Sequence, residues 1–118
     1  MIVDDSELMR NTVKSTFKGV KIPTNILEAE DGEDAMQVIK NNKIDLILLD
    51  WNMPNLSGID FLKQVRGIDA YKEIPVIMIT SEASKLNVVE AIKAGVSAYI
   101  TKPINSSILL EKISQFLI

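Results

Sequence analysis

Five polar residues that could act on a phosphoryl group stand at, or just after, the ends of short apolar runs. They are Asp4, Asp5, Asp50, Thr80 and Lys102. A carboxylate can serve as a nucleophile or a metal ligand, a hydroxyl can donate a hydrogen bond, and an ammonium group supplies positive charge. These types predict phosphoryl transfer in which Asp50 attacks as the nucleophile while Thr80 and Lys102 contact the phosphoryl oxygens.

The elements that would position these groups follow from the alternation of apolar runs with helical periodicity. We expect strands over about 1–3, 24–29, 46–49, 75–80 and 97–101. Helices are expected after each strand, with helix caps or starts at Ser6, Asp31-Gly32, Ser57-Gly58 and Asn105 or Ser106, and with Leu8 and then Leu86, Val89 and Ile92 among the apolar positions of the first and fourth helices. The run 46–49 has no polar alternation, which is typical of a central strand covered on both faces.

This alternation predicts an α/β fold, a doubly wound five-stranded parallel sheet in the flavodoxin-like strand order 2-1-3-4-5. In that order the first and third strands are neighbours about 5 Å apart. Asp4, Asp5 and Asp50 would then share one pocket at the carboxyl end of the sheet. The intervals from Asp50 to Thr80 and from Thr80 to Lys102 are each the length of one βαβ unit, so these residues should lie on adjacent strands.

Three carboxylates in one pocket predict a bound cation, since two of them about 5 Å apart repel by a few kcal/mol at an effective dielectric near 20. Oxygen ligands in a site that the protein makes only in part favour Mg²⁺. The chain has no Cys and no His. This inventory excludes disulfides, zinc–thiolate sites and Cys or Ser-His nucleophiles.

Bulk composition narrows the class of protein further. The 118 residues carry a formal net charge of −3 and fit one domain. No run of Lys and Arg points to nucleic acid, and no apolar run approaches the roughly 18 residues of a membrane span. No signal-peptide pattern opens the chain, because Asp4 and Asp5 interrupt its apolar start. We therefore expect a cytoplasmic protein with no nucleic-acid or membrane partner.

Taken one at a time, these residues are weak indicators. A strand-end Asp is usually a solvated cap, Asp4 and Asp5 could simply cap a helix, and Lys102 could be a solvated charge. Tyr99 on a strand is normally half-buried packing, and Trp51 is most simply an exposed ring beside the site. The combination, in this order, is what predicts function.

The sequence resembles the receiver domains of two-component response regulators over its whole length, and the chemotaxis receivers among them in particular. The motifs that carry this resemblance are Asp4-Asp5, Asp50-Trp51-Asn52-Met53-Pro54-Asn55, Gly58, Thr80-Ser81-Glu82-Ala83, Ala94-Gly95, Tyr99 and Lys102-Pro103. It departs from the family in a short apolar lead before Asp4, in Ser81 where a small Ala is usual, and in Ile104 where Phe is common.

The resemblance implies a role for each matching residue. Asp50 would be the phosphoacceptor. Asp4, Asp5 and Asp50, with the backbone carbonyl of Asn52, would bind Mg²⁺, and Thr80 and Lys102 would contact the phosphoryl group. Thr80 and Tyr99 would form the conformational switch, Asn52 and Glu82 would tune dephosphorylation, and the Lys102–Pro103 peptide would be cis.

The resemblance also implies a function and partners. Residues 1–118 would form a single receiver domain that is phosphorylated by a histidine kinase in a phosphorelay, and that is not an enzyme beyond catalysing its own phosphorylation and dephosphorylation. Output would come from binding a target on the face of the fourth helix, fifth strand and fifth helix, with a flagellar switch protein as one candidate. A phosphatase is a further expected partner.

Three alternatives use the same residues. The first is a phosphorelay receiver outside chemotaxis. The second is a Mg²⁺-dependent phosphatase of the haloacid dehalogenase type, although that family places its nucleophile first, in an Asp-x-Asp motif, whereas Asn52 stands two residues after Asp50 here. The third is an interaction module that no longer uses phosphate, which the intact set of acidic residues disfavours.

Overall fold

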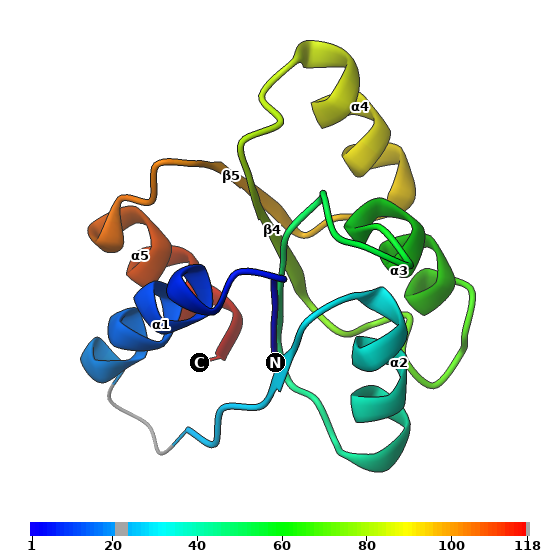
Figure 1. Ribbon diagram of the computed structural model, residues 1–118, viewed down its shortest axis with the longest axis horizontal. Coiled ribbons are helices and arrows are strands. Elements are labelled where there is room, and N and C mark those ends of the chain that lie inside the picture. Colours follow the sequence, from blue (N-terminus) through cyan, green and yellow to red (C-terminus); the bar gives the residue numbers. More distant parts are fainter. Residues whose placement is uncertain (21–23, 118) are drawn as a thin grey trace.

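The computed structural model describes residues 1–20 and 24–117 as five parallel strands alternating with helices (Figure 1). The expected domain, residues 1–118, includes residues 21–23 and 118, which lie outside the described ranges. The strands are β1 (Ile2–Val3), β2 (Glu28–Ala29), β3 (Ile47–Leu49), β4 (Val76–Thr80) and β5 (Ala98–Thr101). The helices are α1 (Glu7–Thr16), α2 (Gly32–Asn41), α3 (Gly58–Arg66), α4 (Lys85–Ala94) and α5 (Ser106–Leu117), with a 3₁₀ turn over Phe17–Gly19.

The sheet has the order β2-β1-β3-β4-β5 and every pairing is parallel. The predicted fold class and strand order are therefore confirmed. Figure 1 shows α1 and α5 on one face of the sheet and α2, α3 and α4 on the other. Connections of this kind are what right-handed βαβ crossovers produce.

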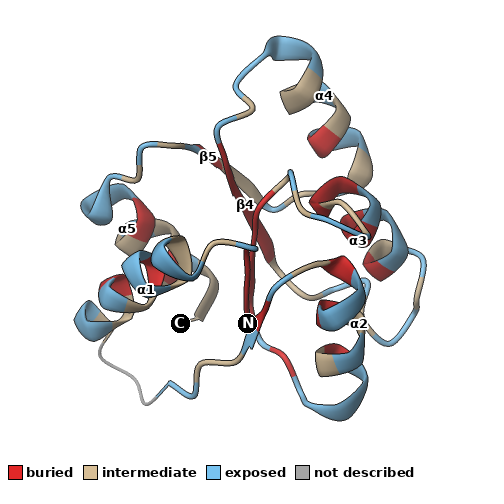
Figure 2. Ribbon diagram, viewed as in Figure 1, coloured by how far each residue is buried: buried red, intermediate tan, exposed pale blue. Residues whose placement is uncertain are grey.

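Two apolar clusters, one on each face of the sheet, hold the layers together. One includes Leu49, Met78 and residues of α2, α3 and α4, and the other includes Leu48, Ile77 and residues of α1 and α5. Successive residues of a strand point to opposite faces, so the uninterrupted apolar runs of β3 and β4 supply both clusters. Figure 2 shows the buried residues concentrated along β4 and on the sides of the helices that face it.

Side-chain caps fix where the helices begin. Ser6, Asp31, Ser57 and Ser84 each accept a hydrogen bond from the backbone N–H three residues on. The side chain of Asn105 accepts hydrogen bonds from the backbone N–H groups of Ser107 and Ile108, the second and third residues of α5. The predicted starts at Ser6 and Ser57 are confirmed, and Asn105 rather than Ser106 caps the last helix. Since these N–H groups have no partner within the helix, each cap sets the helix start.

One expectation about the elements was wrong in detail. The second strand was expected over residues 24–29, but only Glu28–Ala29 pairs, because its sole neighbour β1 has two residues to pair with. The apolar residues that predicted the fourth helix do lie in α4, but they differ in burial. Leu86 is 83% and Ile92 63% exposed, whereas Ala94 packs against the core cluster beside the buried Ala91.

No helix within the described ranges has the length and apolar character needed to cross a membrane.

Candidate functional site

The carboxyl ends of four neighbouring strands bring the predicted site residues together. Asp4 follows β1, Asp50 follows β3, Thr80 ends β4 and Lys102 follows β5. The backbone N–H of Asp50 donates to the carbonyl of Val3, and that of Lys102 donates to the carbonyl of Thr80, both at 2.9 Å. The sheet's hydrogen bonding thus continues to these residues and fixes their backbones. This edge of an open α/β sheet, where the strand order reverses, is where such folds bind ligands.

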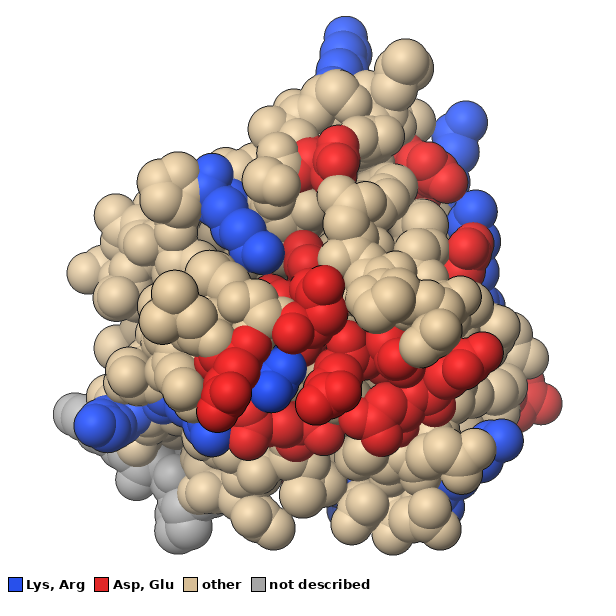
Figure 3. Space-filling model, viewed as in Figure 1, with Lys and Arg blue, Asp and Glu red and all other residues tan. Residues whose placement is uncertain are grey.

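Asp4, Asp5 and Asp50 form a compact group of carboxylates. One oxygen from each lies within 4.8 Å of the others, with Asp4 and Asp50 buried and Asp5 exposed. Acidic side chains gather in a continuous region near the middle of the face seen in Figure 3. A set of oxygen donors at this spacing can hold a hard divalent cation, with its open side left to water. The residues present therefore fit a metal site.

The carboxyl group of Asp50 is held in a setting that opposes its ionisation. Burial is the main cause and the negative charge of Asp4 the second, and together they raise the pKa of Asp50 to about 6 although Lys102 acts in the opposite direction. Burial disfavours a charged carboxylate and a second carboxylate repels it. A cation held by Asp4, Asp5 and Asp50 would be stabilised by the ionised carboxylate of Asp50, so metal and proton compete for this side chain.

We expect this raised pKa to appear in the pH dependence of stability without metal. The folded chain binds the Asp50 proton more tightly than the unfolded chain, whose pKa is near 3.8, so the stabilisation is full below that value and is lost as pH rises through about 6. Urea unfolding at about pH 4.5 and about pH 7.5 measures this for the natural chain and an Asp50→Asn variant. The free energy of unfolding of Asp50→Asn, relative to that of the natural chain, should be higher at about pH 7.5 than at about pH 4.5. The same difference between the two proteins at both pH values would contradict a raised pKa for Asp50.

Lys102 bridges the two buried carboxylates. Its Nζ lies 3.4 Å from Asp4 Oδ2 and 3.4 Å from Asp50 Oδ1, and its side chain is largely buried. Both distances are longer than those of strong charge-assisted hydrogen bonds, which leaves the ammonium group able to turn towards a further acceptor. The Lys102–Pro103 peptide bond is cis.

Thr80 and Tyr99 both make hydrogen bonds to the backbone of Glu82. The Glu82 N–H donates to Thr80 Oγ1 at 3.1 Å, and the Tyr99 hydroxyl donates to the Glu82 carbonyl. Thr80 is fully buried, whereas the Tyr99 ring is half-buried against the core cluster. The backbone of Glu82, just after β4, therefore links the Thr80 hydroxyl at the end of β4 to the Tyr99 ring on β5.

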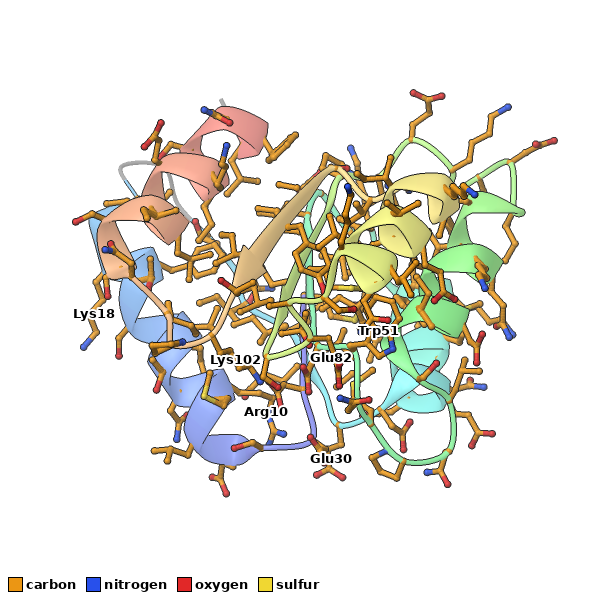
Figure 4. The ribbon with its side chains drawn as sticks, turned by 90° about the horizontal axis from the view of Figure 1, so that it is seen from above. Arg10, Lys18, Glu30, Trp51, Glu82 and Lys102 are labelled. Carbon is orange, nitrogen blue, oxygen red and sulfur yellow. The ribbon has the colours of Figure 1, made fainter. Side chains whose placement is uncertain are left out.

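The side chain of Glu82 links the loops that follow β3 and β4. Asn52 Nδ2 donates to Glu82 Oε1 at 2.7 Å, and Asn87 Nδ2, from the first turn of α4, donates to Glu82 Oε2 at 2.9 Å. Figure 4 shows Glu82, Lys102 and Trp51 near the carboxyl end of the sheet. The two predicted tuning residues, Asn52 and Glu82, are thus in direct contact with one another.

The loop after β3 is held more tightly than its sequence indicates. The Gly58 N–H donates to the Trp51 carbonyl, and Asn55, which has a φ of 66°, donates from Nδ2 to the Asp31 carboxylate at 2.7 Å. Trp51 was expected to be an exposed ring, but it is partly buried and packs against the core cluster. The loop that carries Asn52 is therefore fixed at both ends and in the middle.

Sequence reasoning missed Arg10 and Asn87. Arg10 Nη1 donates to the carbonyl of Asp4 at 2.7 Å and its Nε to Glu28 Oε1 at 3.0 Å, which ties α1 and β2 to the acidic group. The sequence carries no signal for the contacts of Arg10, because both partners lie outside the helix that contains it. Asn87 carried no signal at all, because its partner is the carboxylate of Glu82, which a sequence does not orient.

Comparisons with known proteins agree with this geometry. The chain matches the family described as response regulator receiver domain over residues 1–114. It is 39% identical to the chemotaxis protein CheY of Pseudomonas aeruginosa, with 98% of this chain and 92% of the relative covered. It is 43% identical to CheY1 of Helicobacter pylori, with 96% and 91% covered.

Solved structures give the same result. The chemotaxis response regulator CheY4 of Vibrio cholerae superposes with a TM-score of 0.87 at 32% identity, over 98% of this chain and 95% of that one. The receiver domain of the Francisella response regulator 1452 superposes with a TM-score of 0.85 at 32% identity, over 98% and 92%. This chain belongs to the response regulator receiver domain family.

Proposed function

We propose that this chain is a response regulator that accepts a phosphoryl group on Asp50 from a histidine kinase, within a two-component pathway of chemotaxis. The observation that carries the proposal is the grouping of Asp50 with Asp4, Asp5 and Lys102 at the carboxyl end of the sheet, with Thr80 at the end of the neighbouring strand β4. Curated relatives that bear the name chemotaxis protein support the choice of pathway. A receiver of another phosphorelay is the alternative.

The chemistry follows from the roles of these groups. An ionised Asp50 oxygen attacks the phosphorus atom of the donor, the phosphorus–nitrogen bond of the phosphohistidine breaks, and the imidazole leaves with its electron pair. A bound Mg²⁺, held by Asp4, Asp5, Asp50 and the Asn52 carbonyl, would supply positive charge for the phosphoryl oxygens. Lys102 Nζ would leave its long contact with Asp50 and donate to one of these oxygens.

Thr80 would donate its hydroxyl proton to a second phosphoryl oxygen. It accepts from the Glu82 N–H, so its own proton remains available for this bond. Because the Tyr99 hydroxyl donates a hydrogen bond to the backbone of Glu82 as well, a shift of Thr80 would be transmitted through Glu82 to β5. Self-catalysed phosphorylation and dephosphorylation would follow from this set of groups, without a separate substrate pocket.

Output would come from a partner that binds near α4, β5 and α5. Leu86, Val89 and Ile92 on α4 are exposed apolar side chains, as is Ile108 on α5. Several exposed apolar side chains on one helix, as on α4, would suit a surface used for binding. A flagellar switch protein is the candidate target, and a phosphatase would act on the same phosphorylated state.

Acetyl phosphate with and without Mg²⁺ tests the proposal, with intact-mass spectrometry as the readout. We expect one phosphoryl group per chain with Mg²⁺, and none after chelation, because the acidic group repels the anionic donor when no cation is bound. Uptake that persists unchanged after chelation would contradict the metal assignment. Steady hydrolysis of many phosphomonoesters would favour a phosphatase instead.

Removal of one metal ligand gives a second expected result. Asp5→Asn should weaken Mg²⁺ binding by about tenfold, because a charged ligand is replaced by a neutral one. The single Trp of the chain, Trp51, adjoins Asp50, so its fluorescence can follow a Mg²⁺ titration. Asp69→Asn removes an equal charge from a side chain that is 98% exposed and should leave the affinity unchanged. Equal affinities for both variants would contradict the role of Asp5.

A further inference from the structure

The carboxylate of Glu82 is held from two sides by side-chain amides. Oε1 accepts from Asn52 at 2.7 Å and Oε2 accepts from Asn87 at 2.9 Å. The first amide belongs to the loop after β3 and the second to α4. Each carboxylate oxygen thus has its own donor, and the two donors come from separate elements.

Asn87 is well placed to keep this arrangement fixed. It lies in the first turn of α4, where its own backbone N–H donates to the capping hydroxyl of Ser84 at 3.2 Å. Its side chain is partly buried. A donor whose backbone is fixed by a helix cap lowers the freedom of the acceptor side chain that it holds.

The bridge between Asn52 and Glu82 joins the segments that follow β3, which leads into Asp50, and β4, which ends at Thr80. Asn52 is two residues past Asp50, Glu82 is two residues past Thr80, and β3 and β4 are neighbours in the sheet. Without the Asn87 bond, Glu82 Oε2 loses its donor and the carboxylate is free to turn towards water. The bridge to Asn52 would then be formed for a smaller fraction of the time.

We propose that Asn87 is a positioning residue that lengthens the lifetime of phosphorylated Asp50 by holding Glu82 against Asn52. This inference rests on the proposed function. In the step concerned, a water oxygen attacks the phosphorus atom, the bond from phosphorus to the Asp50 oxygen breaks, and the carboxylate is regenerated. Inorganic phosphate leaves and the water's proton passes to solvent. The bridge obstructs the approach of that water, and Asn87 keeps the bridge closed.

The test is the rate constant for loss of the phosphoryl group after acetyl phosphate is removed, with Mg²⁺ in excess. In Asn87→Ala this rate constant should rise by about 3- to 10-fold, the range to which one hydrogen bond corresponds. Asn87→Asp should raise it at least as much, because a second carboxylate cannot donate to Glu82. An acidic residue in the first turn of a helix is favourable, so α4 should remain folded in this variant.

A double-mutant comparison separates positioning from a general loss of structure. In a Glu82→Ala background, Asn87→Ala should have no further effect, because Asn87 acts only through the carboxylate. Asn41→Ala is the control, since the Asn41 side-chain amide likewise donates one hydrogen bond, but to the Gln37 carbonyl at the end of α2, far from Glu82 in the sequence. It should leave the rate constant unchanged.

The outcomes distinguish this inference from the function on which it rests. If the natural chain takes up no phosphoryl group, the proposed function and this inference are both overturned. If Asp50 is phosphorylated but the lifetime in Asn87→Ala and Asn87→Asp equals that of the natural chain, only this inference fails. An equal acceleration by Asn87→Ala in both backgrounds would overturn it too, because the effect would not pass through Glu82.

Discussion

Asp50→Asn should abolish phosphoryl uptake from acetyl phosphate while leaving the fold intact. The carboxamide keeps the shape of the side chain but offers no anionic oxygen to attack phosphorus. Burial and the charge of Asp4 already oppose ionisation of Asp50, so a neutral side chain there should keep or raise the free energy of unfolding at neutral pH. Intact-mass spectrometry measures the uptake and urea unfolding measures the stability.

The same strand provides the control for this variant. Asp45 lies at the opposite end of the β3 segment, is exposed, and belongs to no group of metal-ligating side chains within the described residues. Asp45→Asn should therefore take up one phosphoryl group per chain, as the natural chain does. If Asp50→Asn still takes up one phosphoryl group per chain, the assignment of Asp50 as the phosphoacceptor is wrong, whatever the control shows.

The position of Asp50 could be predicted because it depends on backbone physics alone. An unbroken apolar run predicts a central strand, and parallel strands bring their carboxyl ends to one edge. The same rule predicts the positions of Asp4, Thr80 and Lys102, because each stands at the carboxyl end of a strand. Their proximity could therefore be predicted without knowledge of side-chain conformations. The regular alternation of strands and helices predicts a parallel sheet, and five strands fit the flavodoxin-like order among the common doubly wound ones.

The contacts around Glu82 could not be predicted in that way. Its carboxylate joins Asn52 and Asn87 through side-chain rotamers, and a rotamer depends on packing that no periodicity encodes. The burial of α4 could not be predicted for a related reason. Leu86 and Ile92 are exposed, whereas Ala91 is buried and Ala94 packs against the core cluster, so the spacing of apolar residues alone does not identify the buried side.

Gly58→Ala should be among the most destabilising single changes in the chain, at about 3 kcal/mol, the upper range for inserting an atom into a packed site. A Cβ added at Gly58 would lie 1.8 Å from the Asp50 carbonyl oxygen and 3.1 Å from Trp51 Cα. Neither is the end of a flexible side chain, so the start of α3 or the backbone of Asp50 must move. The hydrogen bond from the Gly58 N–H to the Trp51 carbonyl, at 2.8 Å, would be strained with it.

Gly67, at the other end of α3, offers a matched control for this substitution. At Gly67 an added Cβ would meet its nearest atom, the Lys63 carbonyl oxygen, at 3.5 Å, and the backbone has an ordinary helical φ of −84°. Gly67→Ala should therefore change the free energy of unfolding by less than about 1 kcal/mol. The clash at Gly58 is with the backbone of Asp50, the proposed phosphoacceptor. Any Gly58→Ala protein that still folds should therefore accept a phosphoryl group more slowly than Gly67→Ala. Equal unfolding midpoints and equal uptake rates for the two variants would show that this loop is not held as tightly as its contacts indicate.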